Sequence, residues 1–255
     1  MVSVTQRIKD IKQPRGGYLP IKKFSHIQLS TENELNLDES IFPSLIGIAV
    51  DYLTRFMIGE PIEEAFRISL NGASRLNNNE LKKAKGLLNN IQGLDKMSIV
   101  SASQLAGYDT VRRAGPRTYK PVELIIPDDP TIENVQKMVK RSLNFIETYG
   151  PIVLSGFSID SASRTKLITS GDGDFLTEDA LWDFKVSKNG PTKDHTLQLL
   201  IYYLMVKRSS QYKKHFDTLK YLGIYNPRLQ SVYKILISDI SPEIIETVEK
   251  EVIGY

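Results

Sequence analysis

The sequence contains no cysteine among its 255 residues. This absence excludes disulfide bonds, thiolate zinc sites, cysteine-held iron–sulfur clusters and a cysteine nucleophile. Long apolar runs are also missing. The longest, Leu199 to Val206, has eight residues, whereas a membrane-spanning helix needs about 20. The chain also has no Gly-x-x-x-x-Gly-Lys-Ser/Thr segment and no Gly-x-Ser-x-Gly segment, so neither a P-loop motor nor a serine-hydrolase elbow is predicted.

What is present is typical of a globular protein. Hydrophobic residues make up 41% and charged residues 25% of the chain, close to the averages for folded domains. The 33 Lys and Arg residues exceed the 30 Asp and Glu residues by three, which mildly favours a polyanionic partner. Because the first residues carry charges where a signal peptide needs an apolar stretch, we expect a cytoplasmic protein without membrane association.

The hydrophobic pattern changes near residue 150. Residues 43–113 show helical spacing, and a further helix is predicted from Thr131, as N-cap, to Thr148. After Gly150-Pro151 the pattern favours short strands around one buried helix. The strands are expected at Ile152–Ile159, Thr165–Ile168, Gly173–Leu176, Ala180–Val186, Leu219–Tyr225 and Ser231–Ile237, the buried helix at His195–Arg208, and a last helix from Ser241 to Val252.

This order predicts the α/β class, with a mixed sheet flanked by helices. We expect residues 1–150 to form an N-terminal arm and a mainly helical lobe, including a core helix near 43–58. Residues 151–255 would then form the sheet-containing core.

Three charged residues on neighbouring strands form the most informative group. Asp183 and Lys185 are two positions apart and therefore point to the same face of their strand. Asp174, on the preceding strand, can reach the same place; Asp172 is the alternative. Two carboxylates suit a hard cation such as Mg²⁺, and a lysine beside them can neutralise charge on a phosphate. An Asp-x-Lys pair alone usually marks a solvated strand face, but here it stands among apolar residues, which favours a buried strand.

Three short motifs carry a family resemblance: Gly171-x-x-Asp174, Asp183-x-Lys185 and Gln198-x-x-x-Tyr202. In this order they resemble the PD-(D/E)XK nuclease superfamily, and more narrowly the branch typified by the RecB nuclease domain. The resemblance implies a restriction-endonuclease-like core in which Asp174 and Asp183 bind metal and Lys185 is catalytic. It also implies that Gln198 orients the metal site and that Tyr202 lies near the nucleic-acid backbone. Without the resemblance, Tyr202 is interpreted as a core aromatic residue.

An upstream motif of that branch is matched only in part. The branch has a helical Gly-x-x-x-His, whereas here Gly47 is followed by Asp51 at the histidine position. Asp51 could supply a further metal ligand through oxygen, or it could simply begin an exposed helix face. Both interpretations stay open.

Other polar residues offer weaker candidates. His195 precedes Gln198 by three positions and either caps the start of the buried helix or faces the site. Nucleic-acid contacts are predicted for Lys188 and Lys193, in the loop that follows the active strand, and for Arg112 and Arg113 in an upstream basic loop.

Taken together, these features predict a Mg²⁺-dependent nuclease, with Mn²⁺ able to substitute, that acts on nucleic acid and on DNA in particular. By analogy with the family, phage defence or mobile-element biology would suit such an enzyme, a protein partner could supply targeting, and a homodimer would suit paired cuts by an endonuclease. The alternative is a non-catalytic nucleic-acid-binding or assembly module that retains the fold. The sequence leaves open DNA or RNA, single or double strands, and endonuclease or exonuclease action.

Overall fold

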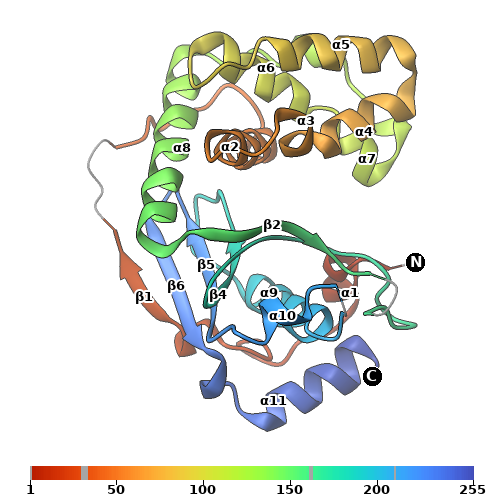
Figure 1. The fold of residues 1–255 in the computed structure, drawn as a ribbon, viewed down its shortest axis with the longest axis vertical. Helices are drawn as coiled ribbons and strands as arrows, with labels where there is room; N and C mark the ends of the chain where they lie inside the picture. The colour runs from red at the N-terminus through yellow and green to blue at the C-terminus, as the bar shows by residue number, and fades with distance from the viewer. Residues whose placement is uncertain (1, 30–33, 161–162, 210) are drawn as a thin grey trace. The chain divides into compact units, whose positions relative to one another are not determined.

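The computed structural model describes residues 2–29, 34–160, 163–209 and 211–255. The chain divides into two compact units (Figure 1): a sheet unit, described over residues 2–29 and 146–255 apart from these gaps, and a helical unit, described over 34–145. The N-terminal arm therefore belongs with the sheet, which differs from the expected boundary at residue 150. Val4 N–H donates to the Ser170 carbonyl at 2.9 Å, and Arg7 Nε donates to the Val252 carbonyl at 2.9 Å.

In its described residues, the sheet unit contains six strands in the order β1-β6-β5-β4-β3-β2. Their bounds are β1 Ser25–Gln28, β2 Ile152–Ser158, β3 Asp172–Thr177, β4 Ala180–Phe184, β5 Tyr221–Asn226 and β6 Ser231–Leu236. The helices of this unit are α1 Val4–Asp10, α9 Lys193–Val206, α10 Lys213–Phe216 and α11 Pro242–Thr247, the last continued by a π-helical turn over Val248–Ile253. The predicted mixed α/β class, a sheet flanked by helices, is confirmed.

One pairing in the sheet is parallel and the others are antiparallel. β4 and β5 run parallel, with Asp183 paired with Ile224, because the chain returns through α9 between them, as a parallel connection requires. Neighbours joined by short turns, β3–β4 and β5–β6, pair antiparallel. The crossover sets α9 against β4 and β5.

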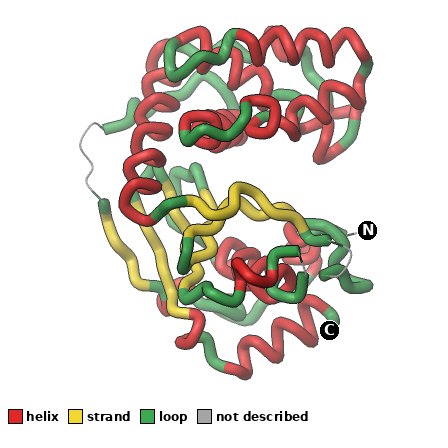
Figure 2. Tube along the Cα trace, in the orientation of Figure 1, coloured by secondary structure: helices red, strands yellow, loops and turns green. Residues whose placement is uncertain are grey.

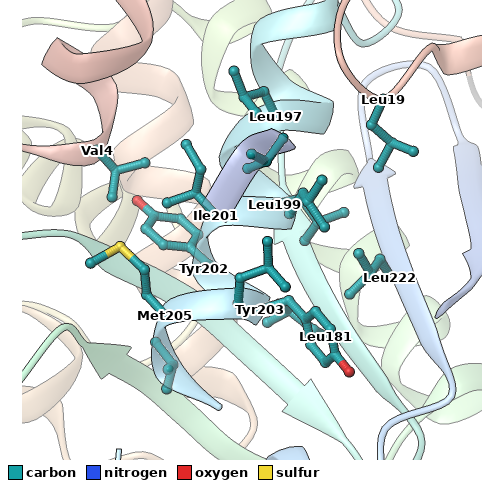
Figure 3. Packing of buried hydrophobic residues seen from close by; sticks show 14 of the residues in the cluster. Val4, Leu19, Leu181, Leu197, Leu199, Ile201, Tyr202, Tyr203, Met205 and Leu222 are labelled. Carbon is teal, nitrogen blue, oxygen red and sulfur yellow. The ribbon is translucent and has the colours of Figure 1, made fainter. Parts of the chain in front are cut away.

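Helix α9 forms the centre of the sheet unit's core. The residues from Leu199 to Val206 are all buried, which confirms the predicted buried helix. Figure 3 shows Leu199, Ile201, Tyr202, Tyr203 and Met205 of this helix together with Leu181 of β4, Leu222 of β5 and Val4 of α1. Burial of side chains of this size contributes about 1.5–3 kcal/mol each, so the packing fixes α9 on one face of the sheet.

The helical unit consists of short helices and the long α8 (Figure 2). Their bounds are α2 Pro43–Met57, α3 Ile62–Ala65, α4 Arg67–Leu76, α5 Asn78–Asn89, α6 Lys96–Ala106, α7 Asp109–Ala114 and α8 Asp129–Tyr149, whose last residues belong to the sheet unit. Helix α2 packs on α6, and α4 packs on α5 and α7. The predicted helical nature of residues 43–113 is confirmed.

Two local expectations are wrong, and one strand was not expected. Thr165–Ile168 is not a strand, because the Thr165 hydroxyl accepts the N–H groups of Leu167 and Ile168 and holds a turn. Thr131 does not cap α8, which begins at Asp129. The Asp128 carboxylate instead accepts the Thr131 N–H at 3.0 Å. Strand β1 was not expected, since its four exposed residues are held only by pairing with β6.

Within the described residues, no helix combines the length and the apolar character needed to cross a membrane.

Candidate active site

Asp183 lies in β4 on the face of the sheet that α9 covers. It follows Leu181, which packs against α9, by two positions, and alternation along a strand puts both side chains on one face. The intervening Trp182 points to the other face, where its ring meets Tyr149 edge-to-face at 5.4 Å. The tryptophan and the aspartate therefore lie on opposite faces of β4, as the alternation of a strand requires.

The Asp183 carboxylate is buried, with only 3% of its side chain exposed. Its Oδ1 accepts a hydrogen bond from Lys185 Nζ at 2.8 Å. Its Oδ2 is buried, and among the described residues no group donates a hydrogen bond to it. Buried polar atoms are normally paired, and an unpaired one costs about 1–3 kcal/mol. This oxygen is therefore positioned to accept a ligand.

Asp174 lies on β3, beside this carboxylate. The β3–β4 pairs Phe175–Trp182 and Leu176–Leu181 define the register. At the next position the Asp174 Oδ2 accepts the main-chain N–H of Phe184 at 2.6 Å. The side chain thus reaches across to the residue that follows Asp183, so the structure brings together the two carboxylates that the sequence paired.

Gln198 and Tyr202 face this group from α9. Gln198 Nε2 donates to the Tyr202 hydroxyl at 3.1 Å. Burial raises the pKa of the Tyr202 hydroxyl well above its ordinary value, opposed by the hydrogen bond from Gln198. The negative charges of Asp183, Asp174 and Asp172 raise this pKa further. The tyrosine is therefore held in its neutral form.

The position of Tyr202 corrects one expectation. Only 4% of the residue is exposed, and its ring packs edge-to-face on Phe157 at 5.9 Å. A side chain this deeply buried does not offer a surface to a nucleic-acid backbone. This burial agrees with its interpretation as a core aromatic residue.

Gly171 has a steric role that its motif did not reveal. A β-carbon at this position would lie 2.9 Å from Cε1 of Tyr202 and 2.8 Å from Cγ2 of Val4. Real side chains essentially never approach so closely. The glycine three residues before Asp174 therefore leaves room for the tyrosine that closes the back of the site.

His195 lies in the first turn of α9, three positions before Gln198. Its Nδ1 accepts the main-chain N–H of Thr192 at 3.2 Å and so caps the start of α9. Burial lowers the pKa of His195, and the positive charge of Lys185 lowers it further, while Asp183 and Asp194 oppose this effect. The capping interpretation of His195 is confirmed, and its part in the site stays a prediction.

The predicted basic contacts are divided between the two units. Lys188, in the loop after β4, and Lys193, at the start of α9, are exposed in the sheet unit. Arg112 and Arg113 were expected in a loop but lie in the last turn of α7 in the helical unit, where both are exposed. The Arg113 guanidinium lies 3.6 Å from Asp109. All four side chains are accessible to an anion.

Asp51 lies on α2 in the helical unit. Its Oδ1 accepts a hydrogen bond from Arg55 Nε at 3.0 Å, one helical turn away. An ion pair of this spacing is a common feature of a helix surface. The role of Asp51 as a metal ligand stays a prediction.

The donor set fits a small hard cation. Among the described residues, no three His, Cys, Asp or Glu side chains are grouped closely enough to form a protein-only cage. Mg²⁺ does not require one, since it commonly binds through one or two carboxylates and retains several waters. Asp174 and Asp183 supply two carboxylates, and the unpaired Oδ2 of Asp183 is a ligand atom without a competing partner among the described residues.

Comparison with known proteins returns no relative: no protein-family model matches the chain, and neither the curated proteins nor the solved structures contain a match.

Proposed function

We propose that the protein is a divalent-metal-dependent nuclease that hydrolyses phosphodiester bonds, with Mg²⁺ as the metal and DNA as the first substrate to test. The observation that carries the proposal is the buried Asp183 carboxylate, with one oxygen on Lys185 and the other unpaired. Burying a carboxylate is costly unless a cation or donors satisfy it. Lys185 pairs with one oxygen of the carboxylate, Oδ1, and a metal ion would pair with the other, Oδ2.

Each residue of the group has a chemical role in the proposed reaction. Asp174 and Asp183 would hold the cation. When bound, Mg²⁺ supplies positive charge beside the scissile phosphate and eases the loss of a proton from water. Lys185 donates to a phosphate oxygen and stabilises the negative charge that grows there during attack. Its side chain is 24% exposed, so it can turn from Asp183 toward a substrate.

The residues of α9 position this chemistry. Gln198 is partly exposed at the site while its amide is fixed on the Tyr202 hydroxyl. Lys188 and Lys193 would bind the flanking phosphates. Removing one such contact weakens binding and lowers its salt dependence.

A cleavage assay tests the proposal. Linear and circular duplex DNA, single-stranded DNA and RNA are each incubated with the protein in Mg²⁺, Mn²⁺ or chelator. Asp183→Asn and Lys185→Met are expected to lose at least a hundredfold in rate, as removal of a charge-stabilising group does in other enzymes. The matched controls are Asp217→Asn and Lys213→Met, which disrupt an exposed Asp–Lys pair of the same unit at 2.6 Å.

The outcomes separate the proposal from its alternative. Metal-dependent cutting that is lost in both site variants and kept in both controls supports the nuclease. Salt-sensitive binding without cutting of any substrate would favour the non-catalytic binding module. Cutting that persists in chelator, or in Lys185→Met, would refute the assigned chemistry.

A further inference from the structure

A cavity of about 630 Å³ opens in the helical unit. Its lining comes from two stretches of chain, residues 39–45, where α2 begins, and residues 107–125, from the end of α6 to the turns after α7. Its volume lies within the usual range for small-molecule sites, about 300–1,000 Å³. None of its lining residues belongs to the proposed active site.

One wall of the cavity is held in place by a polar network. The Tyr119 hydroxyl donates to Glu80 at 2.6 Å, and its ring stacks on Tyr108 with centroids 5.9 Å apart. Lys83 pairs with Glu80 at 2.9 Å and also with Glu123. These contacts fix residues 119–123 on α5. Ordering this wall would therefore cost little of the binding free energy of a ligand.

The mouth of the cavity combines an exposed aromatic ring with a cation. Phe42 is 69% exposed, although it is a large apolar residue. The Lys120 ammonium lies 6.0 Å from the centre of its ring. Leu124, also in the lining, is 74% exposed. Apolar residues left exposed around a cavity commonly mark a binding site.

The stretch of chain that forms one wall of the cavity carries several cations. Lys120 is the cation of the lining, and the same stretch of chain also carries Arg112, Arg117 and Arg113, the last of which lies 3.6 Å from Asp109. The acidic residue in the lining is Glu39, and Asn134 Nδ2 donates to its Oε1 at 3.1 Å. Glu123 is paired with Lys83. A purely apolar peptide would make no use of these cations.

We propose that this cavity binds an unpaired nucleotide of a nucleic-acid strand. The base would lie on the Phe42 ring within the apolar lining, and Lys120 and Arg117 would pair with the adjoining phosphates. Aromatic stacking beside cationic residues is how proteins hold single strands without sequence preference. The inference deepens the proposed function, on which it rests for the choice of a strand over a free nucleotide, and it narrows the substrate to nucleic acid with unpaired bases.

Binding measured in chelator tests the inference without any chemistry. A 20-nucleotide single strand with 2-aminopurine at its centre is titrated with the full chain, beside a blunt duplex and beside free dAMP and dATP. Phe42→Ala is expected to weaken single-strand binding about tenfold, in keeping with the energy of one stacked base. Stacking on Phe42 is expected to change the fluorescence of 2-aminopurine when the strand binds, and Phe42→Ala should remove this change. Phe42→Tyr should retain the affinity and the fluorescence change. The matched control is Met97→Ala, which truncates a 63% exposed apolar residue of the same unit outside the lining.

Lys120→Ala tests the electrostatic contribution to strand binding. It should lower the slope of log affinity against log salt by about 0.7, the value for one phosphate contact on a single strand. The control Lys85→Ala, an exposed lysine on α5, should bind the strand with the affinity of the wild type.

Each result has one meaning. Equal single-strand affinity for Phe42→Ala and the wild type would overturn the inference, and so would tight binding of dATP with no effect of Phe42 on the strand. Loss of binding in Phe42→Ala with none in Met97→Ala would support it. The cleavage assay tests the proposed nuclease separately. If the wild type shows no metal-dependent cutting, the nuclease proposal fails, but the binding result is unaffected.

Discussion

Addition of Mg²⁺ is expected to stabilise the sheet unit through Asp183. A ligand that binds only the folded state stabilises it by RT ln(1 + [L]/Kd), which is about 1.4 kcal/mol at ten times Kd. For a unit of this size, that free energy corresponds to a rise in Tm of roughly 3–6 °C. The unpaired Oδ2 of the buried carboxylate is the structural reason for expecting this rise.

The variant Asp183→Asn isolates this oxygen. The asparagine has the same shape, and its Oδ1 can still accept from Lys185, but its other atom is a neutral amide that does not bind Mg²⁺. The variant should therefore lose the Mg²⁺-dependent rise in Tm. In chelator its stability should differ from that of the wild type by no more than about 1–2 kcal/mol, because loss of the charge on the unpaired oxygen is offset by a weaker interaction with Lys185.

Trp182 makes the measurement specific to the sheet unit. It is the single tryptophan of the chain, it adjoins Asp183 in β4, and it is 1% exposed, with its indole N–H donating to the Thr177 hydroxyl at 3.0 Å. Its fluorescence should shift to the red when the sheet unit unfolds. Thermal melts followed by this signal in Mg²⁺ and in chelator compare the wild type with Asp183→Asn.

The control is an exposed carboxylate of the same unit. Asp217→Asn changes a carboxylate that is 44% exposed, so its stability should change by less than about 0.5 kcal/mol and its response to Mg²⁺ should stay that of the wild type. A wild-type Tm that does not respond to Mg²⁺ would refute the metal-binding role of the orphan oxygen. An Asp183→Asn protein that responds as strongly as the wild type would refute it as well.

Three further outcomes are expected. Lys185→Met should lower the cleavage rate by at least a hundredfold, measured on the substrate that the wild type cuts best, while a normal Trp182 spectrum checks its fold. Since the pKa of His195 is lowered in the folded protein, the folded state binds fewer protons there than the unfolded state. Stability should therefore fall as the pH drops below about 6.5, and His195→Asn should flatten this part of the profile in denaturant titrations. Gly171→Ala should destabilise the sheet unit by about 1–3 kcal/mol, because its β-carbon would press on the ring that backs the site. Gly190→Ala, where the nearest atom is a hydroxyl oxygen at 3.3 Å, should cost less in the same melts.

Elements with strong local patterns could be predicted from the sequence. Helix α9 and strands β2 to β6 lie close to their expected ranges because each carries an apolar run bounded by turn residues. The shared face of Asp183 and Lys185 follows from the period of two in a strand, and their hydrogen bond bears it out.

Features that depend on distant residues could not be predicted. Strand β1 is four exposed residues, Ser25 to Gln28, whose extended form comes from its ladder with β6. The N-terminal arm belongs with the sheet through contacts such as that of Arg7 with Val252, 245 positions apart in sequence. No local pattern records such a pairing, because the interaction requires the rest of the fold.

The candidate site shows the same division between local and distant information. Spacing placed Gln198 and Tyr202 on one helical face, and the hydrogen bond between them agrees. The burial of Tyr202 was not visible in that spacing, since a tyrosine four residues from a glutamine can face either the core or the solvent. The steric need for Gly171 likewise arises from a ring that is about thirty positions away in sequence.

Asp183 is difficult to explain as a residue selected for folding alone. Its position within the apolar strand β4 would suit a hydrophobic side chain, which would pack against α9 without leaving an oxygen unpaired. Replacing a buried ion pair by hydrophobic residues is often neutral or stabilising. A carboxylate kept at such a position, with a lysine on one oxygen and a second carboxylate on the next strand, is energetically reasonable when a cation completes it. Local rules of folding are broken most often where a protein binds or reacts, and this unpaired oxygen is therefore the atom on which the metal hypothesis depends.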